Sequence, residues 1–275
     1  MFQMPAWATQ ATVDEMRTIA SDPHTKALFA ASGMSSVEDI VQKAIMLQEC
    51  ALRGDAKRPY VCVMRGAFLR PRVVDHPSYP LIMSQQAGER CRFLDLGCCM
   101  GTDLRQMLLD GAQKELVHGV DFSPDFIRLG FELFGDEATM DGVFQRVDIL
   151  DGWDSGSELG ASSATGWMSE HVSSFDVVHC GAVLHTLESK EEVQEVLKRV
   201  FCLLAPGGVY FGGNRPTWVH DAKSFHEELE SVGFEGVEVT VRSGQNEADA
   251  ENVLFKNASA EESGRGTYFV AFKPH

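Results

Sequence analysis

The stretch RFLDLGCCMGTDLRQML, residues 92–108, constrains the fold of this chain more than any other. A short apolar strand ends at Gly97, the chain then crosses two cysteines to Gly101, and an amphipathic helix follows. The two glycines bracket the turn, where a missing Cβ allows positive φ and lets a ligand approach the backbone closely. The pattern predicts a strand, a tight turn and a helix that together bind a nucleoside.

Two classes of nucleoside ligand bind at such a turn, and they differ in charge. A dinucleotide places its pyrophosphate on the N-terminus of the helix, and its fingerprint requires glycine at the third and sixth positions. Cys99 and Thr102 occupy those positions here, and Asp103 would repel a phosphate. S-adenosylmethionine (SAM) has no phosphate and carries a sulfonium cation, so the spacing D-x-G-x-x-x-G favours SAM. The turn residues expected to contact it are Asp95, Gly97, Cys98 and Gly101.

The segments after the turn alternate between strand and helix patterns. LVHGVDFS (116–123) is an apolar run that ends in Asp121, where a second strand presents an acid to the ribose hydroxyls. SPDFIRLGFELF (123–134) has a Ser-Pro helix start followed by apolar residues at helical spacing. The later segments predict a third strand at 143–150, a long loop with a short helix at 151–174, a fourth strand and loop at 175–187, and a helix, turn and fifth strand at 191–213.

Strands that alternate with helices form a parallel sheet covered on both faces. In the tail, a helix around KSFHEELESVGF precedes the strands VEVTVRS and GTYFVAFKP, which are close enough in sequence to pair as an antiparallel edge. We therefore predict an α/β fold, with a Rossmann-like, doubly wound, mostly parallel seven-stranded sheet and an antiparallel edge strand. This domain is expected to span residues 90–275.

Residues 1–89 are predicted to form an N-terminal helical cap and a connector. ATVDEMRTIA, HTKALFAAS and SVEDIVQKAIMLQECAL have helical spacing, and Ser36 with Asp39 forms a capping start. We expect two or three helices packed over the cofactor cleft, although a purely stabilising extension is the alternative. Four prolines then mark the connector as irregular: Pro59, Pro71, Pro77 and Pro80.

The motifs FLDLGCCMG, GVDFS, VDIL, FDVVHCGAVLH and LLAPGGVYF, in this order, resemble those of class I SAM-dependent methyltransferases over roughly residues 90–274. RPYVCVMRGAFLRPRVVDHPSYPLI, followed by FLDLGCC, LLDGA and IRLGFELF, is similar to the small methyltransferases of fungal secondary-metabolite (meroterpenoid) clusters. Some of those are implicated in methyl-ester formation on meroterpenoid carboxylates. The resemblance implies a methyltransferase of secondary metabolism with SAM as cofactor. Cys99 departs from the class, where many members carry the central glycine of the first motif.

Further cofactor contacts are expected at the ends of the strands. Asp121 would bind the ribose, Asp148 would receive the adenine amino group, and Phe122 and Ile149 could sandwich the adenine ring. Cys180, near the end of the fourth strand, completes the expected cofactor set. Phe122 and Ile149 could equally be ordinary core residues.

The methyl acceptor determines which other residues would act. His185 could take a proton from a hydroxyl group as a general base, whereas an ionised carboxylic acid needs only orientation. Arg65 or Arg72 could hold a carboxylate through a bidentate fork, and Trp218 could line an apolar substrate pocket. Each of these residues also has a structural alternative, in a helix cap, on the surface or in the core.

We predict transfer of a methyl group to a small molecule, with an oxygen nucleophile (carboxylate or hydroxyl) as the first choice. Nitrogen, sulfur and carbon acceptors stay open, because the fold does not set the acceptor. A SAM-bound catalyst without methyl transfer, pericyclase-like, or a binding subunit is the second hypothesis. A nicotinamide oxidoreductase is disfavoured by Cys99, Thr102 and Asp103.

The charge of the chain limits its partners. A formal net charge of −16 without a basic stripe argues against nucleic acid. No apolar run approaches the length of a membrane span, the first residues lack a signal-peptide pattern, and seven cysteines without metal spacing fit a reducing compartment. The sequence therefore predicts a cytoplasmic monomer or homodimer with a small-molecule substrate and no metal.

Overall fold

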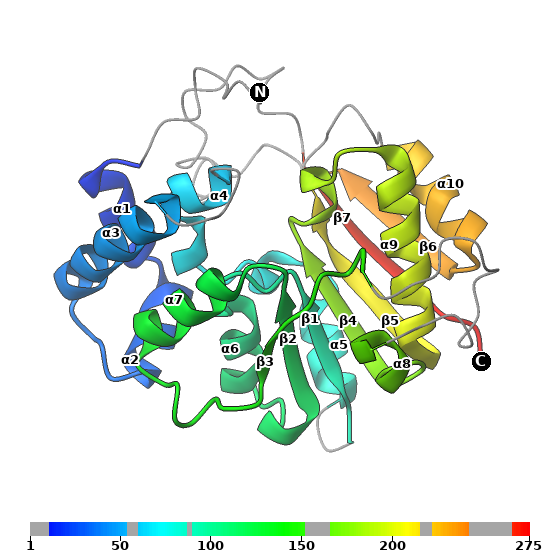
Figure 1. The fold of residues 1–275 in the computed structure, drawn as a ribbon, viewed down its shortest axis with the longest axis horizontal. Coiled ribbons are helices and arrows are strands. Elements are labelled where there is room, and N and C mark those ends of the chain that lie inside the picture. Colours follow the sequence, from blue (N-terminus) through cyan, green and yellow to red (C-terminus); the bar gives the residue numbers. More distant parts are fainter. Residues whose placement is uncertain (1–10, 54–59, 87–89, 152–165, 215–221, 242–265) are drawn as a thin grey trace.

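The computed structural model describes residues 11–53, 60–86, 90–151, 166–214, 222–241 and 266–275. A seven-stranded sheet runs through it in the order β3-β2-β1-β4-β5-β7-β6 (Figure 1). Its strands are β1 (Phe93–Leu96), β2 (Val117–Asp121), β3 (Phe144–Arg146), β4 (Phe175–Gly181), β5 (Leu204–Asn214), β6 (Glu235–Val241) and β7 (Thr267–Phe272).

The pairing of the strands confirms the predicted fold class. β3, β2, β1, β4 and β5 pair in parallel, and β7 pairs antiparallel with both β5 and β6 at one side of the sheet. All four residues of β1 are buried, as expected for a central strand covered on both faces. Because side chains alternate along a strand, Phe93 and Leu94 enter different core clusters on opposite faces.

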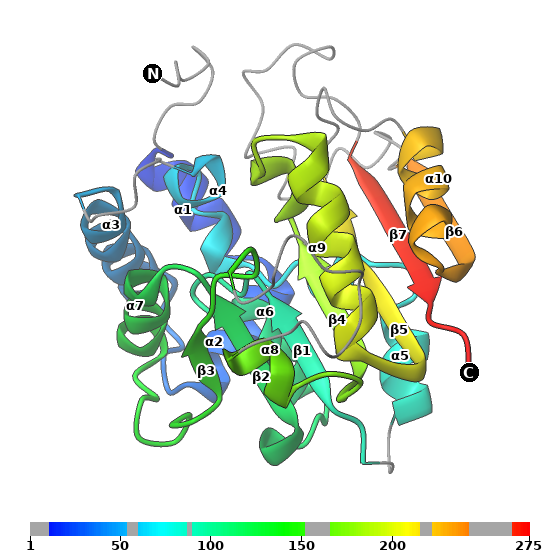
Figure 2. The same cartoon turned by 45° about the vertical axis from the view of Figure 1, so that its right-hand side comes forward.

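Two groups of helices cover the two faces of the sheet (Figure 2). Apolar residues of α8, α9 and α10 form one core cluster with the sheet, and residues of α5 and α6 belong to the cluster on the other face. The helices are α5 (Tyr79–Gln86), α6 (Thr102–Leu109), α7 (Pro124–Phe134), α8 (Gly166–Glu170), α9 (Lys190–Leu203) and α10 (Ala222–Val232). Among the described residues, none of the helices has the length and apolar character needed to cross a membrane.

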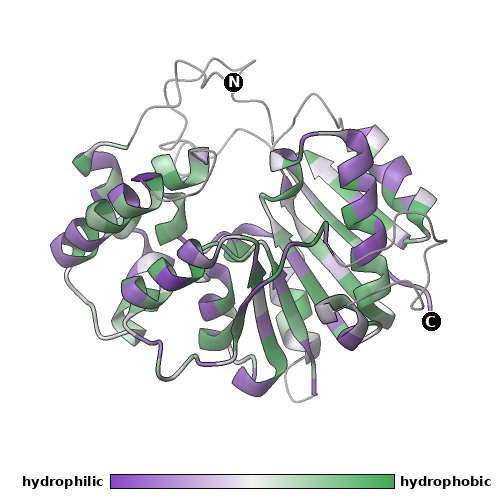
Figure 3. Cartoon of the chain, viewed as in Figure 1, coloured by the Kyte–Doolittle hydropathy of each residue, from purple (hydrophilic) through white to green (hydrophobic). Residues whose placement is uncertain are grey.

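Of the two or three helices predicted at the N-terminus, three are present: α1 (Val13–Ala20), α2 (Pro23–Ala31) and α3 (Val37–Arg53). The Ser36 hydroxyl accepts a hydrogen bond from the Asp39 amide (3.3 Å), which confirms the predicted capping start. The helices lie beside α7 and share one apolar cluster with it, in which the rings of Phe29 and Phe134 stack 5.0 Å apart. Apolar residues are concentrated between the elements of this cluster and along the sheet (Figure 3).

The structure corrects two expectations about segment boundaries. The connector contains α4 (Val61–Met64), two 3₁₀ turns and α5 rather than only irregular chain. Pro80 fits α5 because it lies in the first helical turn, where the missing N–H would be unsatisfied anyway. β3 ends at Arg146 instead of residue 150, because Asp148 turns the chain and accepts the Leu150 amide (3.0 Å).

Gly130 of α7 packs directly against the backbone of the turn at residues 97–101. A Cβ at this position would lie 2.3 Å from the carbonyl oxygen of Met100. We expect Gly130→Ala to destabilise the protein by about 1–3 kcal/mol, because a backbone carbonyl cannot rotate away. The better helix propensity of alanine, worth about 1 kcal/mol, offsets only part of this cost.

Denaturant unfolding measures this effect. Glu132→Ala, at an exposed position of the same helix, is the control and is expected to change the free energy of unfolding by less than about 0.5 kcal/mol. A Gly130→Ala protein as stable as the wild type would show that the turn does not contact α7 in this way.

Candidate active site

The turn between β1 and α6 adopts an unusual backbone conformation. Gly97, Cys99 and Gly101 have positive φ angles of 71°, 52° and 72°. Positive φ is uncommon for a residue other than glycine, so Cys99 has to be held in place. The carbonyl oxygen of Val120 accepts hydrogen bonds from the Gly97 amide (2.8 Å) and the Cys98 amide (3.0 Å). The end of β2 therefore anchors the start of the turn.

Asp121 at the end of β2 holds the rest of the turn. One carboxylate oxygen accepts the Cys99 amide (2.8 Å), and the other accepts the Ser123 amide (2.9 Å). Burial raises the pKa of Asp121 to about 6, although these two backbone hydrogen bonds act in the opposite direction. Each oxygen keeps a second lone-pair direction for a ligand hydroxyl. The predicted ribose contact therefore stays a prediction at a position that suits it.

The space left by the missing side chains of the two turn glycines is filled by protein. A Cβ on Gly97 would lie 2.2 Å from Cγ2 of Val183, and one on Gly101 would lie 2.5 Å from the ring of Phe144 and 2.6 Å from Arg105. Gly97 also lines a pocket, whereas Gly101 does not. Gly101 therefore permits close packing of Phe144 and Arg105 against the turn, and its contact with the cofactor stays a prediction.

Arg105 of α6 stabilises the turn through its side chain, a role that the sequence does not predict. Its guanidinium is buried and donates to the carbonyls of Met100 (2.8 Å) and Gly101 (3.1 Å). It also pairs with both carboxylate oxygens of Asp136 (2.7 and 2.8 Å) and lies 4.3 Å from the centroid of the Phe134 ring. Nothing in the helical pattern distinguishes this arginine from a surface residue.

The connector covers the N-terminus of α6. The Thr102 hydroxyl donates to the carbonyl of Phe68, and Asp103 accepts the amides of Arg72 (2.5 Å) and Val73 (2.9 Å). A dinucleotide would need this helix end for its pyrophosphate. The geometry therefore agrees with the choice of SAM over a dinucleotide.

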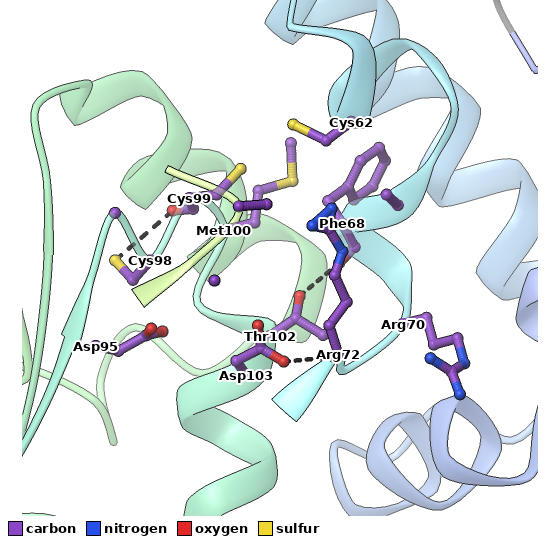
Figure 4. Close-up of a pocket in the computed structure, with 14 residues that line it drawn as sticks. Cys62, Phe68, Arg70, Arg72, Asp95, Cys98, Cys99, Met100, Thr102 and Asp103 are labelled. Carbon is purple, nitrogen blue, oxygen red and sulfur yellow. Dashed lines mark hydrogen bonds between the residues drawn. The ribbon is translucent and has the colours of Figure 1, made fainter. Parts of the chain in front are cut away.

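A pocket opens between the turn, the connector and the end of β4 (Figure 4). Its lining includes Asp95, Gly97, Cys98 and Asp103 from the β1–α6 region and Arg72 from the connector. The structure thus brings the predicted cofactor residues Asp95, Gly97 and Cys98 together with the predicted substrate residue Arg72.

A buried ion pair lies at one side of this pocket. Asp95 of β1 and His179 of β4 are register partners on adjacent strands, and Oδ1 of Asp95 lies 2.8 Å from Nδ1 of His179. Asp95 is only 2% exposed, and its Oδ2 has no hydrogen-bond partner within the described parts of the chain. Next to it, a Cβ on Gly181 would lie 2.9 Å from His179 Cε1 and 3.6 Å from Oδ2 of Asp103. The missing side chain of Gly181 lets the His179 ring pack closely against the chain at the pocket, whose lining also includes the carboxylates of Asp95 and Asp103.

The remaining expected cofactor residues are distributed differently. Phe122 is 45% exposed and makes an edge contact with Tyr60, 6.3 Å between ring centroids, so its ring remains accessible to an adenine. Asp148 is half-buried in the turn after β3. Ile149 and Cys180 are buried in the core on the α9 face and do not belong to the pocket lining, so their contact with the cofactor stays a prediction.

The expected substrate residues also separate. Arg65 is 2% exposed and pairs with Glu15 of α1 (2.6 Å), so it stabilises the N-terminal helices instead of lining the pocket. His185 is half-buried in a 3₁₀ turn, two residues after the Val183 that covers Gly97. Trp218 lies outside the described residues.

Comparison with known proteins identifies the domain. Residues 94–210 match the family described as "Methyltransferase domain". The matched residues are a methyltransferase domain, whose cofactor is SAM. Among solved structures, the CurJ carbon methyltransferase has a similar fold, with a TM-score of 0.51, 16% identity, and coverage of 96% of this chain and 70% of that chain.

The methyltransferase domain also has relatives among curated fungal proteins. "O-methyltransferase atr3" of Stereocaulon alpinum is 30% identical over 77% of this chain and 62% of its own length. "Methyltransferase adrK" of Penicillium roqueforti is 31% identical, and "O-methyltransferase phiE" of Fungal sp. (strain ATCC 74256) is 32% identical, each over 54% of this chain. This chain spans 49% and 45% of the length of these two relatives, about half of each.

The residues present fit SAM, the cofactor of the methyltransferase domain. SAM carries an ammonium and a sulfonium cation, and the pocket is lined by the carboxylates of Asp95 and Asp103, of which Asp95 Oδ2 has no hydrogen-bond partner among the described residues. An anionic pyrophosphate would instead meet Asp95 and Asp103. The carboxylates that line the pocket therefore suit a cationic nucleoside.

Proposed function

We propose that the protein transfers the methyl group of SAM to an oxygen nucleophile, a carboxylate or hydroxyl, of a small natural product. The observation that carries this proposal is the unpartnered carboxylate oxygen of Asp95 in the pocket beside the β1–α6 turn. The names of two relatives, both O-methyltransferases, support an oxygen acceptor. Arg72 on the same pocket supports a carboxylate, because a guanidinium binds it through two hydrogen bonds.

Each part of the site has a separate task in this proposal. SAM, when bound, supplies an electrophilic methyl group and leaves as S-adenosylhomocysteine. Asp121 and the turn that it holds bind and orient the nucleoside of SAM. Asp95 and Asp103 accept hydrogen bonds from the ammonium group of SAM. Arg72 orients the acceptor carboxylate, so that alignment of the reacting atoms supplies most of the rate. For a hydroxyl acceptor, His185 would remove the proton.

We also propose the surroundings in which this reaction takes place. The acceptor is a small molecule and not a nucleic acid, which the net charge of −16 supports. Six cysteines have free thiols, which supports work in the reducing cytoplasm: Cys50, Cys62, Cys98, Cys99, Cys180 and Cys202. The protein acts as a monomer or homodimer, with residues 1–89 as a helical cap and connector on a catalytic domain at 90–275.

Product analysis tests the proposal. Purified protein is incubated with SAM and, separately, with panels of carboxylic acids, phenols, amines and thiols, and S-adenosylhomocysteine and the methylated product are measured by mass spectrometry. We expect turnover with an oxygen acceptor. Turnover with amines or thiols alone would overturn the oxygen assignment, and SAM binding without turnover on any acceptor would favour the non-methylating hypothesis.

Two variants distinguish a carboxylate acceptor from a hydroxyl acceptor. With a carboxylate, Arg72→Gln is expected to raise KM by about 10- to 100-fold, the loss of one charge-assisted interaction, while His185→Gln leaves kcat unchanged. With a hydroxyl, His185→Gln is expected to lower kcat by about 10²- to 10⁴-fold, the usual contribution of a general base. Arg128→Gln, on the exposed side of α7, is the control for loss of a positive charge.

A further inference from the structure

His179 is a buried ionisable residue to which the proposed methyl transfer assigns no role. It lies on β4 with its Nδ1 2.8 Å from Oδ1 of Asp95. The other edge of its ring packs against Gly181, where a Cβ would lie 2.9 Å from Cε1, 3.2 Å from Nε2 and 3.6 Å from Oδ2 of Asp103. The imidazole is therefore placed between two carboxylates, at the side of the pocket where the cationic end of a ligand would bind.

The groups around His179 come from each element packed against it. β1 contributes Asp95, α6 contributes Asp103, and the connector contributes Arg72, which also lines the pocket. β5 contributes the uncharged ring of Phe211, whose centroid lies 5.0 Å from that of the His179 imidazole. The ring of His76 in turn packs against Phe211, with 5.1 Å between their centroids. Charged groups thus reach His179 only from the side of the pocket among these neighbours.

The neighbouring charges favour protonation of the His179–Asp95 pair. Burial lowers the pKa of His179, but the hydrogen bond and charge of Asp95 and the charge of Asp103 outweigh it, so that the pKa is raised; Arg72 acts in the opposite direction. Burial also raises the pKa of Asp95, with His179 acting against it. When His179 is protonated, its charge and that of Arg72 together balance the two carboxylates, Asp95 and Asp103. When His179 is neutral, the cluster keeps one negative charge in excess.

We propose that His179 positions Asp95 and exchanges its proton for the ammonium group of the ligand. Its Nδ1–H holds Oδ1 of Asp95, which leaves Oδ2 for the ligand. When an ammonium group binds between Asp95 and Asp103, His179 releases its second proton to solvent, and the charge of the cluster stays balanced. The inference rests on the proposed function for the identity of the ligand, and it adds that SAM binding releases a proton.

Calorimetry counts that proton. SAM is titrated into the full chain near pH 7 in buffers of different ionisation enthalpy, and the dependence of the observed enthalpy on the buffer gives the number of protons released. We expect a release of up to one proton with SAM. 5′-Methylthioadenosine, which shares the nucleoside but lacks the ammonium group, is expected to bind without this release.

His179→Asn is the decisive variant. Its amide N–H can still donate to Asp95, but it cannot titrate. We expect this variant to bind SAM with less proton release than the wild type. Its affinity for SAM should also depend less on pH between 6.5 and 8.5, a range in which the affinity of the wild type changes by up to about tenfold per pH unit. Titration of the amine of SAM itself contributes equally to both proteins, so it cancels when the proton release of His179→Asn is subtracted from that of the wild type. His118→Gln, a histidine on β2 outside the pocket lining, is the matched control and should keep the release of the wild type.

Two further measurements keep the inference testable if His179→Asn does not fold. The NMR shift of the His179 ring proton should titrate above pH 6.5 in the free protein and at lower pH with SAM bound, and Asp103→Asn should reduce the proton release. Equal release in the wild type and His179→Asn, or a ring titration unaffected by SAM, would overturn the inference while leaving the proposed function intact. Absence of SAM binding to the wild type at every pH would overturn the proposed function and this inference together.

Discussion

Asp121→Asn is expected to weaken SAM binding by about 10- to 100-fold. A hydrogen bond from a ligand hydroxyl to a carboxylate is worth about 1.5–3 kcal/mol, and 1.4 kcal/mol corresponds to a factor of ten in affinity. The substitution also replaces one acceptor of the Cys99 and Ser123 amides by an NH₂ group, so the positive-φ turn loses part of its support. Calorimetric titration with SAM measures the effect.

Asp125→Asn is the matched control, because this carboxylate lies on the partly exposed side of α7 and is expected to leave the affinity unchanged. Equal affinities of Asp121→Asn and the wild type would show that Asp121 does not contact the ribose.

The same carboxylate predicts how SAM affinity depends on pH. The pKa of Asp121 is raised by burial to about 6, and only the ionised form accepts from both ribose and backbone. Affinity should therefore fall as the pH is lowered through about 6, and Asp121→Asn should lose this component. The effect on stability has the opposite sign: a raised carboxyl pKa means that ionisation costs folding free energy as the pH rises, so acid does not destabilise the fold through Asp121. An affinity that is constant between pH 7 and 5 would contradict the prediction.

Arg105→Met is expected to reduce the free energy of unfolding by about 3–5 kcal/mol, the usual cost of removing one partner of a buried ion pair. It leaves Asp136 without its ion-pair partner and removes the guanidinium hydrogen bonds to the carbonyls of Met100 and Gly101, of which the Gly101 carbonyl keeps the backbone amide of residue 105. Urea unfolding measures the loss. The control Arg128→Met removes a surface ion pair on α7 and should cost less than about 1 kcal/mol.

A second substitution tests the mechanism of this loss. Arg105→Met combined with Asp136→Leu removes both charges and should recover part of the stability, since the uncompensated carboxylate is gone. If Arg105→Met is no more harmful than Arg128→Met, the guanidinium is not what holds the turn.

The fold could be predicted from the sequence because its signals are local. The run from β1 to α6, the Ser-Pro start of α7 and the Ser36 cap are each set by residues within a few positions of one another. The connector differs from the prediction for the same local reason: its prolines indicate irregular chain, but Pro80 occupies a first helical turn. The short β3 depends on how Asp148 turns the chain, which the apolar pattern of 143–150 does not reveal.

The site could be predicted only in part, because much of it forms between distant residues. Asp121 and Gly97 belong to strand ends, where topology alone places ligands. The contact of Asp103 with the amide of Arg72 and the pairing of Asp95 with His179 join residues far apart in the sequence, so neither follows from a motif. The face of a strand or loop that a residue occupies is equally hidden, so the sequence does not predict the burial of Arg65 against Glu15, the packing at Gly101 or the core positions of Ile149 and Cys180.

The central claim is that the pocket beside the β1–α6 turn binds SAM. The most direct test is a calorimetric titration of the purified chain with SAM, S-adenosylhomocysteine and NAD. We predict that SAM and S-adenosylhomocysteine bind with dissociation constants in the micromolar range, that Asp121→Asn weakens both, and that NAD does not bind. Binding of NAD, or no binding of SAM, would contradict the claim.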